Sequence, residues 1–376
     1  MNLIELYTNE IKKKIIKNKA LFNIKNSNDI KNIIVEIPPD KFNFDLSSNA
    51  AMILAKKSND NPKEVANKLK DILQKEITDF SIIEIAGPGF LNFKISGNIW
   101  IKTIESIFQA RKNYGSNKHK KNFNIEFVSA NPTGPMHVGH CRGAVFGDVL
   151  SNLLIFNGGK VTKEFYINDY GNQIHNFVKS VYLRIREIKF KENFPSNQDL
   201  YNGDYVIDIA RSILKNTKKN TLNSFDKSFQ FLKKESLKYS LNLIKSDLKL
   251  LGVKHDLFFS ETKMVKNKSV DKIIKSLKKK NLVFEGYLDA PKGEDVTKWK
   301  KTKRLIFKST MFGDDSDRAL QKNDGTWTYF ANDIGYHSTK IKKKYDSLIN
   351  ILGADHIGYI KRISAAVKAM SNNKIV

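Results

Sequence analysis

Apolar residues recur along this chain with two periods, one typical of helices and the other of strands. A four-residue spacing from Leu3 to Ile15 predicts an opening helix, and apolar residues from 225 to 251 predict a long amphipathic helix. Residues 62–76, which begin with a proline, predict a further helix. Alternating apolar residues on both sides of a Gly-Pro-Gly turn at 87–89 predict a hairpin. The pattern indicates a protein of mixed α/β structure.

The stretch 123–159 has the clearest order of elements. Residues 123–129 mix apolar and β-branched types as a buried strand does, and the next six, ANPTGP, can continue neither a strand nor a helix. Helical spacing begins at Met136 and ends at a Gly-Gly pair, and residues 160–169 predict a second strand. These elements predict a right-handed parallel βαβ unit whose ligand lies at the carboxyl ends of the strands.

The elements divide the chain into two parts. Residues 1–112 form a small α/β unit without a catalytic cluster, and a polar, basic linker follows at 115–122. The parallel-sheet unit occupies 120–376, with an insertion at about 190–300 that carries the long helix. We expect Asp169 to cap the helix that follows the second strand.

The composition is that of a globular protein with an excess of positive charge. Hydrophobic residues make up 40% of the 376 residues, and the formal net charge is +26. Only 8 of the 65 basic residues are arginine, the better bidentate reader of phosphate. An excess of lysine, asparagine and isoleucine also arises from an AT-rich genome. The charge therefore suits an RNA partner without establishing one.

Cysteine usage and the N-terminus indicate a compartment. Cys141 is the single cysteine, so no disulfide can form within the chain. No apolar run approaches the length of a membrane span. The first residues are amphipathic, contain acids and lack arginine, unlike a signal or transit peptide. We expect a cytoplasmic protein.

Two histidines stand three residues apart at the start of the predicted helix. His137 and His140 share its first turn, where unpaired amides and a partial positive charge favour phosphate. Their imidazoles can donate hydrogen bonds to nucleotide phosphates as charge builds in a displacement reaction. Gly139 lets a base or ribose approach the backbone. The strand and rigid loop before them favour a nucleotide site over two ordinary surface histidines.

The segment ANPTGPMHVGH, residues 130–140, resembles the HIGH signature of class I aminoacyl-tRNA synthetases in the form carried by arginyl-tRNA synthetases. The preceding IEFVS and GADHIGY at 353–359 also belong to that family's pattern. Residues 303–340 resemble the amino-acid side of the same enzymes' site. There we expect a turn at 323–325, a strand at 326–330, and a helix that begins near Asn332 or Asp333.

A guanidinium substrate needs an ionised carboxylate that accepts two parallel hydrogen bonds, together with a flat wall. Asp333 can supply the first and Tyr329 the second, and Glu126 is a further candidate for the substrate's charged groups. We expect His137 and His140 to share one cleft with Tyr329 and Asp333.

The resemblance implies a Rossmann-like parallel-sheet catalytic domain of class I synthetases after a small α/β domain that contacts the outer corner of tRNA. It implies an arginine–tRNA ligase that activates arginine with ATP and Mg²⁺ and transfers it to tRNA(Arg), a monomer without membrane contact and without metal ligands of its own. The catalytic residues it implies are His137 and His140. The implied contacts to ATP come from Pro132, Gly134, His137, Gly139 and His140. The implied contacts to arginine come from Glu126, Ser129, Asn131, Tyr329, Asp333 and His356.

Arginyl-tRNA synthetases continue beyond the match with further catalytic strands, a KMSKS-type loop and a helical anticodon-binding domain. We expect either a piece of a longer product or a truncated paralogue, in which binding survives better than turnover. Two other functions stay open. A small-molecule nucleotidylyltransferase shares H-x-G-H at a helix start without needing Tyr329 and Asp333, and a non-catalytic RNA-binding remnant would suit the high charge.

Overall fold

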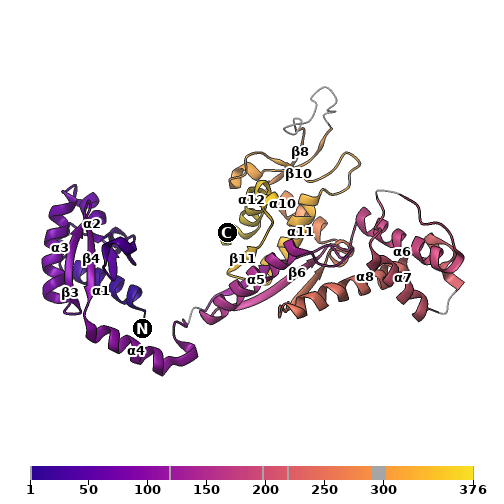
Figure 1. Cartoon of the computed structure of the whole chain (residues 1–376). Helices are drawn as coiled ribbons and strands as arrows, with labels where there is room; N and C mark the ends of the chain where they lie inside the picture. Colours follow the sequence, from indigo (N-terminus) through magenta and orange to yellow (C-terminus); the bar gives the residue numbers. More distant parts are fainter. Residues whose placement is uncertain (1, 118–119, 197–198, 218–219, 289–301, 376) are drawn as a thin grey trace. The chain divides into compact units, whose positions relative to one another are not determined.

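The computed structural model describes residues 2–117, 120–196, 199–217, 220–288 and 302–375. The chain divides into two compact units, Met1–Ser116 and Asn117–Val376, each with its own hydrophobic core (Figure 1). Parts of the predicted linker (118–119) and of the predicted insertion (197–198, 218–219 and 289–301) lie outside the described residues. Within the described ranges, no helix is both long enough and apolar enough to cross a bilayer.

The first unit is an antiparallel sheet packed against helices, with the strand order β1-β2-β4-β3. Its strands are β1 (Val35–Glu36), β2 (Leu46–Ser48), β3 (Phe80–Ala86) and β4 (Phe90–Ile95). Its helices are α1 (Leu3–Lys17), α2 (Ala50–Ser58), α3 (Pro62–Glu76) and α4 (Gly97–Ala110). The predicted opening helix, the helix at 62–76 and the hairpin are confirmed. Tyr7, Ile11 and Ile15 of α1 are buried, as their spacing requires.

The second unit is built on a parallel sheet with the strand order β11-β5-β6-β7. Its strands are β5 (Asn122–Glu126), β6 (Lys160–Ile167), β7 (Leu257–Ser260) and β11 (Ser347–Asn350). The predicted βαβ unit is confirmed, because α5 (Val138–Phe156) connects β5 to its parallel neighbour β6. β11 pairs with the other edge of β5. The carboxyl ends of these strands therefore meet beside the loop that leads into α5.

Small side chains let α5 lie close to the sheet. Its buried face consists of Ala144, Gly147 and Ser151. A Cβ atom at Gly147 would lie 2.2 Å from the Phe127 ring, so only glycine permits this contact. The larger apolar residues that predicted the helix, such as Val145, lie on its exposed side. Their spacing identified the helix but not the face that packs on the sheet.

Between β6 and β7 the described residues include three α-helices around an apolar core of their own. They are α6 (Asn172–Phe190), α7 (Asp204–Asn216) and α8 (Phe225–Leu250), which Figure 1 draws side by side. β7 lies within the predicted insertion and pairs with β6, so that range is not an insertion throughout. Asp169 does not cap α6, whose N-cap is Gly171. Its carboxylate instead accepts hydrogen bonds from the Ser260 hydroxyl at 2.6 Å and the Thr262 amide at 2.7 Å.

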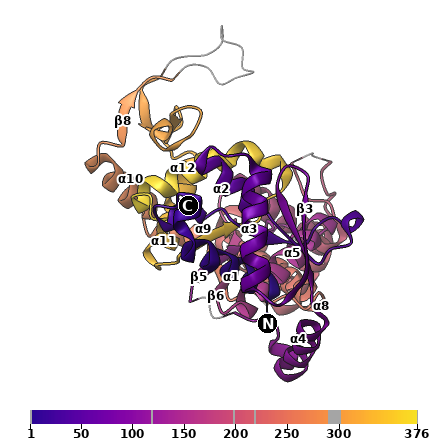
Figure 2. The ribbon, with the colours of Figure 1, turned by 90° about the vertical axis from the view of Figure 1, so that its left-hand side faces the viewer.

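After β7, within 261–288 and 302–375, the chain adds an antiparallel ribbon and four α-helices. The elements are α9 (Glu261–Lys266), α10 (Ser269–Lys279), β8 (Val283–Gly286), β9 (Arg304–Phe307), β10 (Arg318–Ala319), α11 (Tyr329–Lys342) and α12 (Ile360–Ser371). Figure 2 shows β8 standing apart from β5 and β6. The ribbon is a sheet of its own, in the order β10-β9-β8.

The predicted strand at 326–330 is wrong, although the turn at 323–325 is present. α11 already begins at Tyr329. The reason is a capping side chain: the Thr328 hydroxyl accepts a hydrogen bond from the Ala331 amide at 3.3 Å. The helix therefore starts earlier than predicted, and Tyr329 lies one helical turn before Asp333.

His255 is a buried histidine beside the parallel sheet. Its ring centroid lies 4.2 Å from that of Phe127 and 5.4 Å from that of Phe165. Among the residues that the structure describes, none makes a hydrogen bond of normal geometry to either ring nitrogen. Burial lowers the pKa of His255 from 6.5 to about 4, and a polar contact with the Phe127 backbone opposes this only in part. In the unfolded chain His255 takes up a proton near pH 6.5, whereas in the folded chain it does so only near pH 4. The free energy of unfolding is therefore not reduced by His255 above pH 6.5, and it falls as the pH drops from 6.5 towards 4.

We expect His255→Leu, which keeps the volume and removes the ionisable ring, to reduce this loss of stability in acid. The wild-type protein should lose up to roughly 1.4 kcal/mol more than the variant for each pH unit below 6.5. Thermal unfolding followed by circular dichroism at several pH values measures the difference. His175→Leu, a change at an exposed histidine of α6, should keep the wild-type slope. Equal slopes for His255→Leu and the wild type would contradict the assignment.

Candidate functional site

A cavity of about 1040 Å³, named the α5 cavity below, lies at the carboxyl ends of β5, β6 and β11 and at the start of α5. Its wall contains six residues that the sequence predicted: Ser129, Asn131, His137, Gly139, His140 and His356. Arg142 and Asn168 add further polar groups. The motif at 130–140 therefore lies where parallel-sheet proteins bind their ligands.

The backbone fixes the orientation of both histidine rings. His137 is the N-cap of α5, and its Nδ1 atom accepts a hydrogen bond from the Gly139 amide at 3.1 Å. The Nδ1 atom of His140 accepts one from the His137 amide at 3.3 Å. Each neutral ring therefore carries its hydrogen on Nε2, and the rings stack with centroids 3.7 Å apart. Burial, followed by the nearby His137, lowers the pKa of His140. The pair can offer two Nε2–H donors to an anion.

Pro132 and Gly134 do not line the α5 cavity. Pro132 is buried in the loop. A Cβ atom at Gly134 would lie 3.1 Å from the Tyr205 hydroxyl of α7. These two residues shape the loop and its contact with α7. The structure does not place them in direct contact with a ligand in this cavity.

The loop leaves β5 through a strained turn. Val128 has φ 69°, which is rare for a β-branched residue, and Ser129 has φ 41°. The Ser129 amide donates to the Phe127 carbonyl at 2.9 Å and closes a three-residue turn. This turn lets the Ser129 hydroxyl donate to Glu126 Oε1 at 3.1 Å and accept from the Tyr166 amide at 3.0 Å. Strain of this kind is concentrated at binding sites.

Glu126 ends β5 inside a buried network of charges. Its Oε2 atom accepts a hydrogen bond from Lys340 Nζ at 2.7 Å and lies 3.0 Å from the Tyr336 hydroxyl. The same hydroxyl lies 2.8 Å from Glu164 Oε1 on β6. Burial acts to raise the pKa of Glu126, but the Lys340 ammonium and further polar contacts outweigh it, and the net shift is downward. Glu126 is therefore ionised at neutral pH.

The two residues predicted to hold a guanidinium lie in different surroundings. Tyr329 is 79% exposed and lines a different cavity from the one that His137 and His140 line. Asp333 accepts a hydrogen bond from the Tyr359 hydroxyl. Burial raises the pKa of Asp333 to about 6 in spite of that bond. Asp333 also interacts electrostatically with His356, which lines the α5 cavity.

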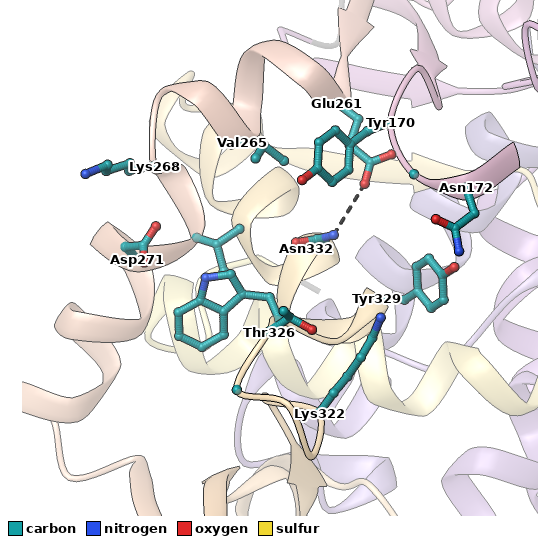
Figure 3. A pocket seen from close by; sticks show the side chains of 14 residues that line it. Tyr170, Asn172, Glu261, Val265, Lys268, Asp271, Lys322, Thr326, Tyr329 and Asn332 are labelled. Atoms are coloured by element: carbon teal, nitrogen blue, oxygen red, sulfur yellow. Dashed lines mark hydrogen bonds between the residues drawn. The ribbon is translucent and has the colours of Figure 1, made fainter. Parts of the chain in front are cut away.

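The second cavity, the α11 cavity, has a volume of about 490 Å³ and lies at the start of α11. Its wall includes Tyr170, Tyr329 and Asn332, together with the buried carboxylate of Glu261 (Figure 3). Asn332 Nδ2 donates a hydrogen bond to Glu261 Oε1 at 3.3 Å, which Figure 3 shows as a dashed line. Burial raises the pKa of Glu261 to about 7, and the negative charge of Asp333 acts in the same direction.

Glu261 and Asp333 are two carboxylates that interact electrostatically, and Asp169 also acts on Glu261. Glu261 lines the α11 cavity, and Asp333 interacts with His356, which lines the α5 cavity. Within the described part of the chain, neither makes a salt bridge with a lysine or an arginine. Two carboxylates in this state favour a cationic ligand, which would stabilise their ionised forms.

The sequence analysis missed Glu261, Tyr336 and Lys340. Glu261 follows β7, a short strand inside the range interpreted as an insertion. Recognising that strand as part of the parallel sheet would have placed Glu261 at the carboxyl edge, where ligands bind. Lys340 precedes three consecutive lysines at 342–344, so the sequence carries no sign that it alone is buried.

Two known families match this chain. The family described as "Arginyl tRNA synthetase N terminal domain" matches residues 5–95, and "tRNA synthetases class I (R), catalytic domain" matches residues 103–374. The arginine–tRNA ligase of Pelagibacter ubique is 50% identical over 377 residues, which cover 100% of this chain and 65% of that protein. The arginine–tRNA ligase of Rickettsia bellii is 45% identical over 371 residues, which cover 98% and 64%. The chain thus spans just under two thirds of the length of these relatives.

Solved structures show the same architecture. The arginyl-tRNA synthetase of Plasmodium falciparum matches with a TM-score of 0.68 and 18% identity, over 99% of this chain and 64% of that one. The Thermus thermophilus enzyme matches with a TM-score of 0.65 and 16% identity, over the same shares. At these identities the likeness concerns the fold. It confirms the predicted Rossmann-like parallel-sheet domain preceded by a small α/β domain.

Proposed function

The chain belongs to the family of class I arginyl-tRNA synthetases, and on that premise we propose that it carries the amino-acid-activating site of an arginine–tRNA ligase. The proposed reaction joins arginine to ATP with release of pyrophosphate and then transfers arginine to tRNA(Arg). The observation that carries the proposal is the α5 cavity with the oriented rings of His137 and His140 in its wall. The carboxylates Glu261 and Asp333, which favour a cation, support the amino-acid side of the proposal.

We propose that ATP binds in the α5 cavity. The first turn of α5 carries a partial positive charge, and the Nε2–H donors of His137 and His140 lie at that turn. The cationic side chain of Arg142 lines the same wall. As charge builds on the phosphates during the displacement, these donors stabilise it. Mg²⁺ commonly binds through substrate phosphates with few protein ligands, and we propose that it enters this site with ATP.

We propose that arginine lies across the two cavities. Glu126, Ser129 and Asn131 would bind its α-amino side, because Glu126 is ionised and its Oε1 atom accepts from the Ser129 hydroxyl at the cavity wall. The guanidinium would reach the pair Glu261 and Asp333. A planar cation with five donors suits two carboxylates better than the single carboxylate that the sequence predicted. Tyr329 would then contact the far end of the ligand from the α11 cavity.

The remaining assignments rest on the family. We propose that the first unit, which matches the N-terminal domain of arginyl-tRNA synthetases, contacts tRNA, and that the protein acts as a monomer in the cytoplasm. The high positive charge is consistent with an RNA partner.

Titration calorimetry tests the proposal with ATP, arginine, lysine and citrulline as ligands. We expect binding of ATP and of arginine, with lysine and citrulline at least tenfold weaker than arginine. Arginine-dependent exchange of pyrophosphate into ATP, with and without tRNA, reports on catalysis. Binding of ATP without any amino acid would favour a nucleotidylyltransferase. Binding of RNA alone would favour a non-catalytic remnant.

A further inference from the structure

A lysine side chain lies completely buried in the second unit. Lys340 of α11 is 0% exposed. Its Nζ atom lies 2.7 Å from Glu126 Oε2, 3.2 Å from Asn350 Oδ1, and 4.4 Å from the centroid of the Tyr336 ring. These contacts reach β5 and β11, so one ammonium group ties α11 to two neighbouring strands. A lysine is rarely buried to this extent unless it is paired.

Of the two donors to Glu126 Oε2, Lys340 and Tyr336, only Tyr336 is shared with a second carboxylate. The Tyr336 hydroxyl lies within hydrogen-bond distance of both Glu126 and Glu164, but its single O–H can donate to only one of them at a time. Glu164 is itself fully buried. Without the ammonium group, Glu126 would be a buried carboxylate that competes with a second carboxylate for one hydroxyl hydrogen. Such a group takes up a proton.

The two oxygens of Glu126 face different parts of the structure. Oε2 is held by Lys340, whereas Oε1 accepts a hydrogen bond from Ser129, which lines the α5 cavity. We infer that Lys340 is a positioning residue: it keeps Glu126 ionised and directed so that Glu126 binds the α-ammonium group of the amino acid. The inference rests on the proposed function, which places that ammonium beside Glu126. Lys340 itself does not touch the substrate.

Several charged and titratable groups lie around Glu126. Besides Lys340, they are Tyr336, His337 and Asp333 on α11, and Glu164 and Tyr166 on β6. Among them, Lys340 contributes most to the ionised form of Glu126. His337 stays neutral near pH 7, because burial lowers its pKa to about 4. Its Nδ1 atom bonds to the Asp333 carbonyl and its Nε2 to the Asn350 amide, each at 2.9 Å.

The test compares two ligands that differ at one group. Arginine carries an α-ammonium, and 5-guanidinopentanoic acid is the same molecule without it. Both carry the guanidinium, so titration of Glu261 and Asp333 affects them equally, and the ratio of their affinities reports on the α-ammonium. Titration calorimetry at about pH 6.5 and about pH 8.5 on the whole chain gives this ratio for the wild type, Lys340→Met and the control Lys342→Met. Lys342 is an exposed lysine of the same helix.

We expect Lys340→Met to weaken arginine about 10- to 100-fold at the lower pH, the range for a charge-assisted contact. Part of that loss should be recovered at the higher pH, where Glu126 ionises without its lysine. The analogue should change by less than about threefold, and Lys342→Met should bind both ligands like the wild type. An equal loss for arginine and the analogue would show a general structural role and would overturn the inference, as would unchanged arginine binding.

A second pair of variants keeps the test decisive if Lys340→Met does not fold. Glu126→Gln and Glu126→Gln/Lys340→Met both lack the carboxylate through which Lys340 acts, and the double variant removes both members of the ion pair. We expect these two to bind arginine equally, within about threefold. A further large loss in the double variant would overturn the inference. Absence of arginine binding by the wild type would instead overturn the proposed function itself, a result that no variant is needed to detect.

Discussion

Alanine at His137 or His140 is expected to slow the activation of arginine by roughly 30- to 1,000-fold, or about 2 to 4 kcal/mol. Each change removes one Nε2–H donor at the point where charge builds on the phosphates. Because this contact strengthens in the transition state, kcat should fall more than KM for ATP rises. Arginine-dependent exchange of pyrophosphate into ATP measures both quantities.

The helix cap at His137 calls for a matched variant. His137 Nδ1 accepts from the Gly139 amide, so alanine also removes a cap worth roughly 1 kcal/mol of stability. His137→Asn keeps a capping oxygen but has no donor that reaches as far as Nε2. We expect it to be nearly as slow as the alanine variant while it recovers the melting temperature. His175→Ala, at an exposed histidine of α6, should keep full activity. Unchanged kinetics in both His137→Ala and His140→Ala would show that the two histidines take no part in the mechanism.

Elements with a strong local signal were predictable from the sequence. α1 and α3 combine regular apolar spacing with a clear start, and the β3–β4 hairpin contains its own turn glycines. The βαβ unit followed from the order of strand, loop, helix and strand, and with it the carboxyl edge where the α5 cavity lies. Local signals were sufficient here because each element is specified by residues within it.

Other features depend on residues far apart in the sequence. The buried face of α5 is set by the Phe127 ring, which admits only Gly147 at that point of contact, and no apolar period reports this. The early start of α11 depends on a single Thr328 cap. The burial of Lys340 requires Glu126, more than 200 positions away, to be brought beside it by the pairing of β11 with β5. The sequence therefore predicted the lining of the α5 cavity better than the contacts around Lys340 and Glu261.

The carboxylates Glu261 and Asp333 should give the proposed arginine site a distinct response to pH. In the free protein burial raises the pKa of Glu261 to about 7 and that of Asp333 to about 6, so both bind protons below these values. The guanidinium is charged at every relevant pH and favours the ionised carboxylates. Binding therefore releases protons, and the affinity for arginine should rise as the pH rises through 6 and 7 and then level off. ATP, for which we propose the α5 cavity, should not follow this profile.

Removal of either negative charge with retention of shape is expected to weaken arginine by about 2 to 4 kcal/mol, the cost of breaking a buried charge pair. Glu261→Gln should abolish the rise in arginine affinity near pH 7 and leave the rise near pH 6. Asp333→Asn should move the remaining step to lower pH, because Asp333 is one of the charges that raise the pKa of Glu261. Citrulline carries no charge and should lose much less than arginine in both variants. Calorimetric titration across this pH range, with ATP as the control ligand, measures each effect.

If Asp333→Asn alone weakened arginine binding, the single-carboxylate site expected from the sequence would stand. If neither did, the guanidinium would bind elsewhere and arginine would lose its place in the proposed function.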